Sequence, residues 1–259
     1  MQNVQGLIAR SNDGVGEIII DRPARKNAIT LSMWLHIPKL IEELAAQARV
    51  IILKGAGSDF SAGADISEFD AERGDAERAR NYEAANARAF AAIRTSQVPV
   101  IAAIRGICFG GGFGLAAACD LRIATPDARF SVPAAKLGLA YPTDAMADIV
   151  DSCGPQLARY LTMTADAVTA AQAVTSGMLL EMVPGDEFDA RVATIANRIV
   201  SNAPLSIKAS RLAIRAALRG DEALRAMAQQ AGDDTFLSED YAEGRSAFKN
   251  KRAPRFVGR

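Results

Sequence analysis

The feature that most constrains the fold is a unit that occurs twice: an apolar run, a loop containing glycine, and then a helical pattern. The first run, "RVIILKG" at 49–55, precedes the loop "SAGAD" at 61–65. The second run, "PVIAAIRG" at 99–106, precedes three consecutive glycines at 110–112. Short apolar runs bounded by turn residues are typical of buried strands, and strands that alternate with helices predict an α/β fold.

The rest of the chain extends this pattern. Residues 6–21 predict a β-hairpin with its turn at Asn12-Asp13-Gly14. Apolar residues at helical spacing predict helices over residues 30–47 and about 75–95, and the chain from residue 186 onward is predicted to be mainly helical. We therefore expect a core domain over residues 1–185 and a helical region over residues 186–259.

Composition narrows the possible partners and location. Thirty basic residues balance thirty acidic ones, whereas a nucleic-acid-binding protein needs a basic surplus. No apolar run is long enough to span a bilayer, and the N-terminus lacks the pattern of a signal peptide. The three cysteines form no CxxC pair, and no His/Cys spacing suits a metal. We expect a soluble cytoplasmic protein with reduced thiols, no metal and no nucleic-acid or membrane partner.

The two glycine loops carry the first chemical inference. Each follows a strand and precedes a helix, so each can point backbone N–H groups outward at a helix N-terminus, where negative charge is favoured. Two such donors that converge on one oxygen form an oxyanion hole. Tight strand–helix turns are the alternative. The spacing matches neither a dinucleotide-binding GxGxxG, nor a P-loop, nor a GxSxG nucleophile elbow, so an oxidoreductase is the weakest of the functions considered.

Together these segments resemble the crotonase (enoyl-CoA hydratase/isomerase) superfamily. The resemblance rests on "FSAGADI", on "PVIAAIRGICFGGGFGLAAACDLRIAT", on the "RP…NA" segment near the start and on "EGRSAFKNKRAPRF" near the end. It implies a spiral of ββα units, a helical C-terminal trimerisation region, and a homotrimer or dimer of trimers (a hexamer). It also implies an acyl-CoA thioester substrate from fatty acid metabolism, with coenzyme A as part of the substrate and no permanently bound cofactor.

The resemblance assigns roles to particular residues. The N–H groups of Ala64 and Gly111 fall at the positions of the oxyanion-hole donors, which hold the thioester oxygen as it becomes an enolate. The coenzyme A contacts fall at Arg25, Lys26, Ala62, Asp65, Ile66, Phe248 and Lys251, of which Phe248 and Lys251 are expected to act across a subunit boundary. A solvated surface role remains open for Arg25 and Lys26, and a helix-capping role for Asp65.

The chain departs from the family at two decisive positions. Hydratases of the family carry two glutamates that activate water and move protons, and here these positions hold Gly114 and Ala134. Addition of water by paired carboxylates is therefore not available from these positions. A carboxylate or another proton carrier has to come from elsewhere in the chain.

Tyr141 and Asp144 are the candidate replacements. Tyr141 aligns with a tyrosine of the family's methylmalonyl-CoA decarboxylase branch, although that branch has a histidine where this chain has Ala64. A buried structural tyrosine and a helix cap are the respective alternatives. Glu68 is expected on a solvated helix face, and Cys108 as a buried small side chain.

The sequence therefore predicts an enzyme of the enoyl-CoA hydratase/isomerase family, in the lyase or isomerase class. The alternatives are a decarboxylase or hydrolase that uses Tyr141 and Asp144, or a catalytically weak CoA-ester binding protein. The acyl group is not predicted.

Overall fold

The computed structural model describes residues 4–259, whose strands form two sheets. The larger sheet has six strands in the order β1 (Leu7–Asn12), β2 (Val15–Ile20), β3 (Val50–Gly55), β4 (Val100–Ile104), β6 (Leu121–Ala124) and β9 (Glu181–Met182). The smaller sheet contains β5 (Ile107–Phe109), β7 (Arg129–Ser131) and β8 (Val168–Thr169). The hairpin β1–β2 is antiparallel, as predicted, and the other pairs of the larger sheet are parallel.

The chain spirals between the two sheets. It passes from β4 into β5 and the helix α4 (Gly111–Ala118), then through β6 into β7. An isolated parallel bridge joins Ser61 to Cys108, so the start of the first glycine loop lies beside the strand that leads into the second, and a further bridge joins Ala64 to Ile29. Two loops that are far apart in the sequence are thereby brought together, and the predicted spiral of strands and helices is confirmed.

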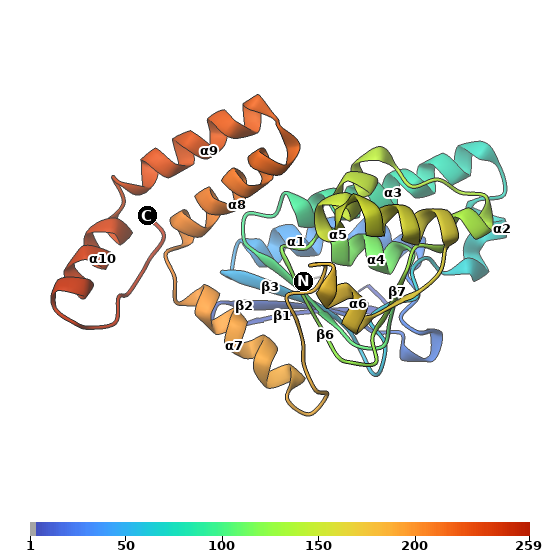
Figure 1. Ribbon diagram of the computed structural model, residues 1–259, viewed down its shortest axis with the longest axis horizontal. Helices are drawn as coiled ribbons and strands as arrows, with labels where there is room; N and C mark the ends of the chain where they lie inside the picture. Colours follow the sequence, from blue (N-terminus) through green and yellow to red (C-terminus); the bar gives the residue numbers. More distant parts are fainter. Residues whose placement is uncertain (1–3) are drawn as a thin grey trace.

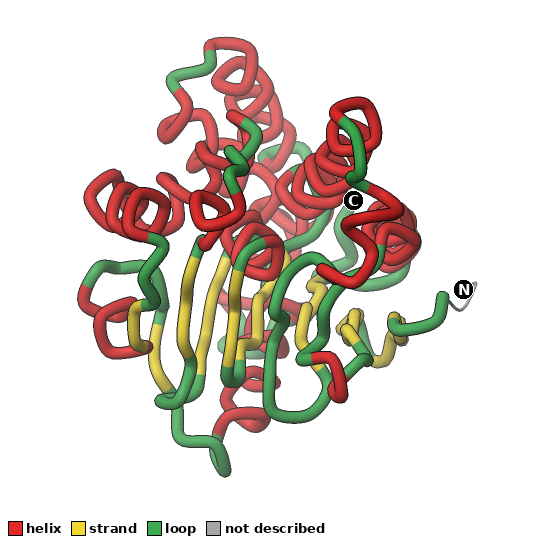
Figure 2. Tube along the Cα trace, turned by 90° about the vertical axis from the view of Figure 1, so that its right-hand side faces the viewer, coloured by secondary structure: helices red, strands yellow, loops and turns green. Residues whose placement is uncertain are grey.

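Helices cover the sheets and complete the core. They are α1 (Leu31–Ala45), α2 (Phe69–Glu72), α3 (Ala76–Arg94), α4, α5 (Thr143–Thr164), α6 (Ala170–Thr175), α7 (Phe188–Val200), α8 (Pro204–Arg219), α9 (Glu222–Thr235) and α10 (Glu239–Lys249), with short 3₁₀ turns at Pro23–Arg25, Ile66–Glu68 and Pro133–Leu137. The two helices predicted over residues 30–47 and about 75–95 are present as α1 and α3. The side chain of Thr30 caps α1, and that of Asp75 caps α3. Figure 2 shows the strands side by side with helices stacked over them.

Two apolar clusters hold the body together. The larger contains Trp34 of α1, Phe90 of α3 and Phe113 of α4, together with side chains of β2, β3 and β4. The smaller lies between α7 and the larger sheet, where Phe188 and Val192 contact strand residues such as Val50 and Ile101. Helix α7 was expected to belong to the separate helical region over residues 186–259, but it packs on the larger sheet. The division into two domains stays a prediction.

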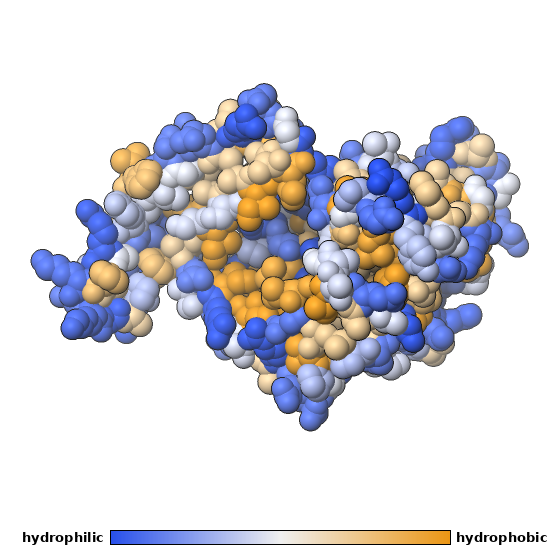
Figure 3. All heavy atoms as spheres, in the orientation of Figure 1, coloured by the Kyte–Doolittle hydropathy of each residue, from blue (hydrophilic) through white to orange (hydrophobic). Residues whose placement is uncertain are grey.

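Helices α8, α9 and α10 form an arm that extends from the body (Figure 1). Ion pairs join its base to the body: Arg211 lies 2.8 Å from Asp120, and Arg219 lies 2.7 Å from Asp148. Apolar residues gather over α8 and in the hollow between α8 and α7 (Figure 3). The exposed apolar side chains of the arm include Ile214, Leu218, Met227, Phe236 and Leu237. Trimer formation through this region stays a prediction.

Two further observations concern membranes and metals. Within residues 4–259, no helix combines the length and apolar character needed to cross a bilayer. In the same range, no three His, Cys, Asp or Glu side chains are grouped so that they could hold a metal ion.

Candidate active site

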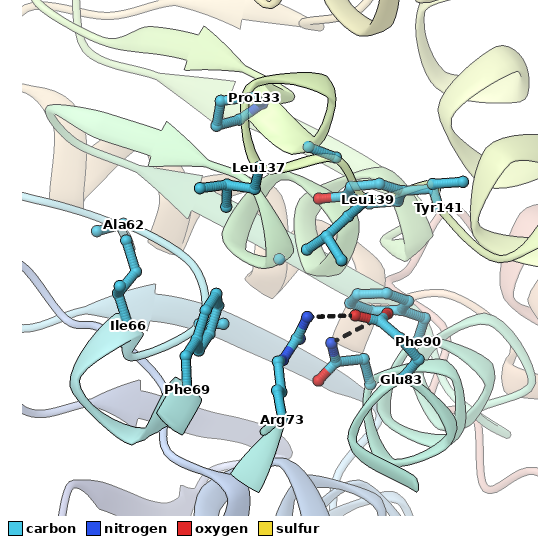
Figure 4. Close-up of a pocket in the computed structure, with 16 residues that line it drawn as sticks. Ala62, Ile66, Phe69, Arg73, Glu83, Phe90, Pro133, Leu137, Leu139 and Tyr141 are labelled. Atoms are coloured by element: carbon cyan, nitrogen blue, oxygen red, sulfur yellow. Dashed lines mark hydrogen bonds and ion pairs between the residues drawn. The ribbon is translucent and has the colours of Figure 1, made fainter. Parts of the chain in front are cut away.

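A cavity of about 100 Å³ opens where the two glycine loops meet. Its walls come from the first loop (Ala62, Ala64), the second loop (Gly110, Gly111), helices α2 and α3, and the segment 133–141. Figure 4 shows the side chains of these segments directed toward a common space. The cavity is therefore built by the two loops that the sequence singled out.

Two backbone N–H groups at this cavity have no partner among the residues that the structure describes. No hydrogen bond within residues 4–259 uses the N–H of Ala64 or that of Gly111, whereas neighbouring N–H groups are bonded: Asp65 donates to Ile29 and Gly110 donates to Ser131. Gly111 is the first residue of α4, and the first N–H groups of a helix have no partner within it. Both donors are thus available to a bound oxygen atom.

The two donors are close because glycines bring the loops together. A Cβ placed on Gly111 would lie 2.8 Å from Cζ2 of Trp34 and 3.8 Å from the nitrogen of Ala64. A Cβ placed on Gly63, whose φ is +93°, would lie 2.8 Å from the nitrogen of Gly111. A side chain at position 63 would press on the second loop, and one at position 111 would collide with Trp34, so glycine is required at both for this approach.

Polar side chains hold the first loop. Asn27 is completely buried; it accepts from the N–H of Arg22 at 2.9 Å and donates to the carbonyls of Ala56 and Asp59 at 2.8 and 2.6 Å. Asp65 accepts from the N–H of Ser67 at 3.1 Å and pairs with Arg22 at 2.8 Å.

These contacts also set the ionisation of Asp65. Burial acts to raise the pKa of Asp65, but hydrogen bonds from Ser67 and Arg22 outweigh it and lower the pKa below its usual value. The Asp65 side chain therefore caps the turn that follows it, which was the alternative to a contact with coenzyme A.

Tyr141 lines the cavity beside the second loop. Its hydroxyl lies 4.0 Å from the position that a Cβ on Gly110 would occupy, and it makes no hydrogen bond within residues 4–259. Burial raises the pKa of Tyr141 well above its usual value. The hydroxyl is therefore neutral near pH 7 and can donate a hydrogen bond to a ligand.

Three polar residues at the cavity were not predicted from the sequence. Arg73 follows α2, and Glu83 and Asn86 lie one turn apart on α3. Glu83 is the only carboxylate among the residues that line the cavity in the described part of the chain. Helical spacing predicts an apolar face and a charged face for α3, but it does not show that polar residues of this helix border the cavity.

Other predicted residues lie away from the cavity. The side chain of Asp144 is 78% exposed in the first turn of α5, 3.8 Å from Arg94, and is not among the cavity's lining residues. Glu68 does not lie on a solvated face as expected, because it accepts from the N–H of Leu31 at the start of α1. Cys108 is buried, as expected, and this burial raises the pKa of its thiol.

The predicted coenzyme A contacts divide into two groups. Ala62 and Ile66 line the cavity, and the exposed residues Arg25 and Lys26 adjoin it, since the carbonyl of Lys26 accepts from the N–H of Ala62 at 2.9 Å. Phe248 and Lys251 lie at the exposed end of the arm, and Phe248 is 88% exposed. Their role at the site stays a prediction that requires a neighbouring protomer.

Comparison with known proteins decides the family. The sequence profile of the enoyl-CoA hydratase/isomerase family matches residues 10–259. The chain belongs to this family.

Relatives within the family carry out more than one reaction. The chain is 31% identical to a short-chain-enoyl-CoA hydratase of Clostridium acetobutylicum, over 96% of each chain. It is 30% identical to a peroxisomal Delta(3,5)-Delta(2,4)-dienoyl-CoA isomerase of Arabidopsis thaliana, over 97% of this chain and 96% of the relative. The crystal structure of an enoyl-CoA hydratase/carnithine racemase from Magnetospirillum magneticum superposes with a TM-score of 0.91 at 33% identity, over 100% of this chain and 97% of that one. The predicted family and fold are confirmed.

Within this family, the two positions that lack glutamate differ in their surroundings. A Cβ placed on Gly114 would lie 2.6 Å from Cζ of Phe90, whose ring packs edge-on against Trp34 with centroids 5.7 Å apart. Phe90 therefore fills the space that a side chain at position 114 would need. Ala134, in contrast, lines the cavity and leaves space beside it.

Proposed function

We propose that this protein binds an acyl-CoA thioester in the cavity and stabilises its enolate through the N–H groups of Ala64 and Gly111. The observation that carries this proposal is the pair of adjacent backbone donors, both without a partner, at the wall of one cavity. Donors fixed before the reaction stabilise charge as it develops on the thioester oxygen, and each typically contributes about 3–4 kcal/mol to lowering the barrier. The proposed enzyme is thus of the lyase or isomerase class.

One reaction within this class has specific support. Decarboxylation of a 2-carboxyacyl-CoA forms an enolate without a base, and Gly114 and Ala134 supply none. The bond between the α-carbon and the carboxylate carbon breaks, its electron pair moves into the enolate, carbon dioxide leaves, and a proton from solvent adds to the α-carbon. Tyr141 is a neutral donor at the cavity and would hold the substrate carboxylate in place. Asp144 takes no part in this proposal because it lies outside the cavity lining.

The donors can be tested by removing one N–H group. Ala64→Pro lacks the backbone donor, and Ala64→Ser retains it and serves as the matched control. Both are assayed with a 2-enoyl-CoA, by loss of the conjugated double bond, and with a 2-carboxyacyl-CoA, by release of carbon dioxide. We expect kcat of Ala64→Pro to fall about 100-fold or more, with Ala64→Ser close to the unmodified protein.

Each outcome of this test has a clear meaning. Equal kcat values for Ala64→Pro and Ala64→Ser would overturn the oxyanion hole. Hydration of the enoyl-CoA without release of carbon dioxide would overturn decarboxylation but not the oxyanion hole. Tight acyl-CoA binding with no turnover of either substrate would instead support a CoA-ester binding protein.

We further propose that the arm assembles protomers into a trimer or a dimer of trimers. The exposed apolar side chains of α8 and α9 support this assembly, as does the place of α10, which carries the exposed Phe248, on the arm that extends from the body (Figure 1). A cytoplasmic location stays a prediction from the sequence.

A further inference from the structure

Three polar side chains form a cluster at one wall of the cavity. Arg73, Glu83 and Asn86, here called the polar cluster, project from α2 and α3 toward the space below Tyr141 (Figure 4). The neighbouring wall is apolar and includes Phe90, Leu137 and Leu139. The glycine loops do not contain these residues, so the proposed enolate chemistry does not account for them.

The guanidinium of Arg73 is buried with fewer partners than it has donors. Its side chain is 7% exposed and lies 4.5 Å from the ring centroid of Phe69 and 4.0 Å from that of Tyr82. Nη1 lies 2.8 Å from Glu83 in an ion pair, but neither Nε nor Nη1 makes a hydrogen bond within residues 4–259. A buried donor without a partner costs about 1–3 kcal/mol, so its retention calls for an explanation.

Asn86 presents the complementary group. Its side chain is buried, its Nδ2 lies 3.5 Å from Glu83, and its Oδ1 has no partner within residues 4–259. The cluster thus offers unused donors on Arg73 and one unused acceptor on Asn86. A single ligand group that both accepts and donates a hydrogen bond would satisfy both.

The charge of the cluster selects among such ligand groups. Glu83 already balances the charge of Arg73, so a carboxylate in the ligand would lie beside Glu83 without a cation of its own, and like charges at short range are unfavourable. A hydroxyl is uncharged and supplies both an acceptor and a donor. The apolar wall between the loops and the cluster suits the carbon chain in between.

We propose that the acyl group of the substrate carries a hydroxyl at its end remote from the thioester, and that Arg73 and Asn86 bind this hydroxyl. The inference rests on the proposed function, because the loops must hold the thioester while the cluster holds the other end. The loops and the cluster line the same cavity, so a short acyl chain is expected to reach from the thioester to the hydroxyl.

Calorimetric binding to the full-length protein tests this substrate class without requiring turnover. The ligands are butyryl-CoA, 4-hydroxybutyryl-CoA and succinyl-CoA, which differ only at the remote end. We expect 4-hydroxybutyryl-CoA to bind about 10-fold or more tightly than butyryl-CoA, and succinyl-CoA to bind no more tightly than butyryl-CoA.

Two variants assign the preference to the cluster. Asn86→Leu removes the acceptor at nearly constant volume, and Arg73→Lys removes Nε while keeping the charge. We expect each variant to bind 4-hydroxybutyryl-CoA and butyryl-CoA equally tightly. Arg88→Met, at an exposed position of the same helix, serves as the control and should keep the preference. Thermal unfolding of each variant shows whether it is folded.

The results separate this inference from the proposed function. Equal binding of butyryl-CoA and 4-hydroxybutyryl-CoA, or a preference for succinyl-CoA, would overturn the hydroxyl assignment while leaving the acyl-CoA site intact. A preference that survives in both Asn86→Leu and Arg73→Lys would also overturn it. Absence of binding for all three thioesters would overturn the proposed function itself.

Discussion

The two glycine loops each place a backbone N–H group at the cavity, but different interactions hold the two loops in position. The second loop is placed by fit, because a Cβ at Gly111 or Gly112 would lie 2.8 Å or less from Trp34 or Ser61, and one at Gly114 would collide with Phe90. The first loop is placed by hydrogen bonds, chiefly those of Asn27 and of Asp65 with Arg22. Each loop presents one N–H group at the cavity that has no partner within residues 4–259.

This difference predicts which substitutions destabilise each loop. A loop held by close packing tolerates no added side-chain volume, whereas a loop held by hydrogen bonds is destabilised when one of the hydrogen-bonding groups is removed. It also explains why a glutamate at position 114 would not fit, since the space there is already occupied by Phe90.

The largest effect is expected for Gly114→Glu. Overpacking costs about 1–3 kcal/mol, and burying a carboxyl group without a partner costs about 1–3 kcal/mol more, so we expect the free energy of unfolding to fall by about 4 kcal/mol. Urea unfolding measures this change. Gly232→Glu is the matched control, because no atom lies within 4 Å of a Cβ at that helical position.

A second substitution sharpens this result. Phe90→Ala, combined with Gly114→Glu, opens the space that the new side chain needs, so the double variant should lose less stability than the sum of the two single variants. Additive losses would show that Phe90 is not what excludes a side chain at position 114.

An intermediate effect is expected for Asn27→Gly. Asn27 has a φ of +54°, which glycine adopts freely, so this variant removes the amide without straining the backbone. It leaves the N–H of Arg22 and the carbonyls of Ala56 and Asp59, which lead into the first loop, without these partners, and we expect a loss of about 3 kcal/mol in the free energy of unfolding. The exposed Asn202→Gly is the control in the same urea titration; a similar loss in both variants would contradict the importance of these bonds.

The smallest effect, and one that depends on pH, is expected for Asp65→Asn. Asparagine can still cap the turn but cannot pair with Arg22, and hydrogen bonds to charged groups contribute about 1.5–3 kcal/mol before screening, so we expect a loss of about 1 kcal/mol. The pKa of Asp65 is lowered in the folded protein from an unfolded value of 3.8. The advantage of aspartate is therefore fully present above this value and disappears as the pH falls through the lower, folded pKa.

Unfolding of the two proteins from pH 7 down to pH 3 measures this dependence. A difference in stability that stays constant over this range would show that the charge of Asp65 does not hold the first loop.

The sequence predicted those features of the fold and the site that are determined by residues close together in the chain. The apolar runs predicted β3 and β4, apolar residues at helical spacing predicted α1 and α3, and the glycines marked both loops. The absence of glutamate at Gly114 and Ala134 was also evident from the sequence. These features follow from local patterns and from alignment with a family.

Features that depend on tertiary packing were not predicted. Phe90 and Gly114 lie on different helices, and nothing in their local sequences indicates that the ring fills the space beside the glycine. Arg73 lies in a run of charged residues that resembles a solvated turn, yet its guanidinium is buried between two aromatic rings. Glu68 was assigned to solvent and instead meets the start of α1, because only the fold brings these segments together.

The contact between Trp34 and the second loop also has a spectroscopic consequence. Trp34 is the only tryptophan among the 259 residues, and it packs against both Gly111 and Phe90. Indole emission from this protein therefore originates at a single place, next to one of the two proposed enolate donors. A ligand that displaces the second loop by a fraction of an ångström would alter that emission without any introduced label.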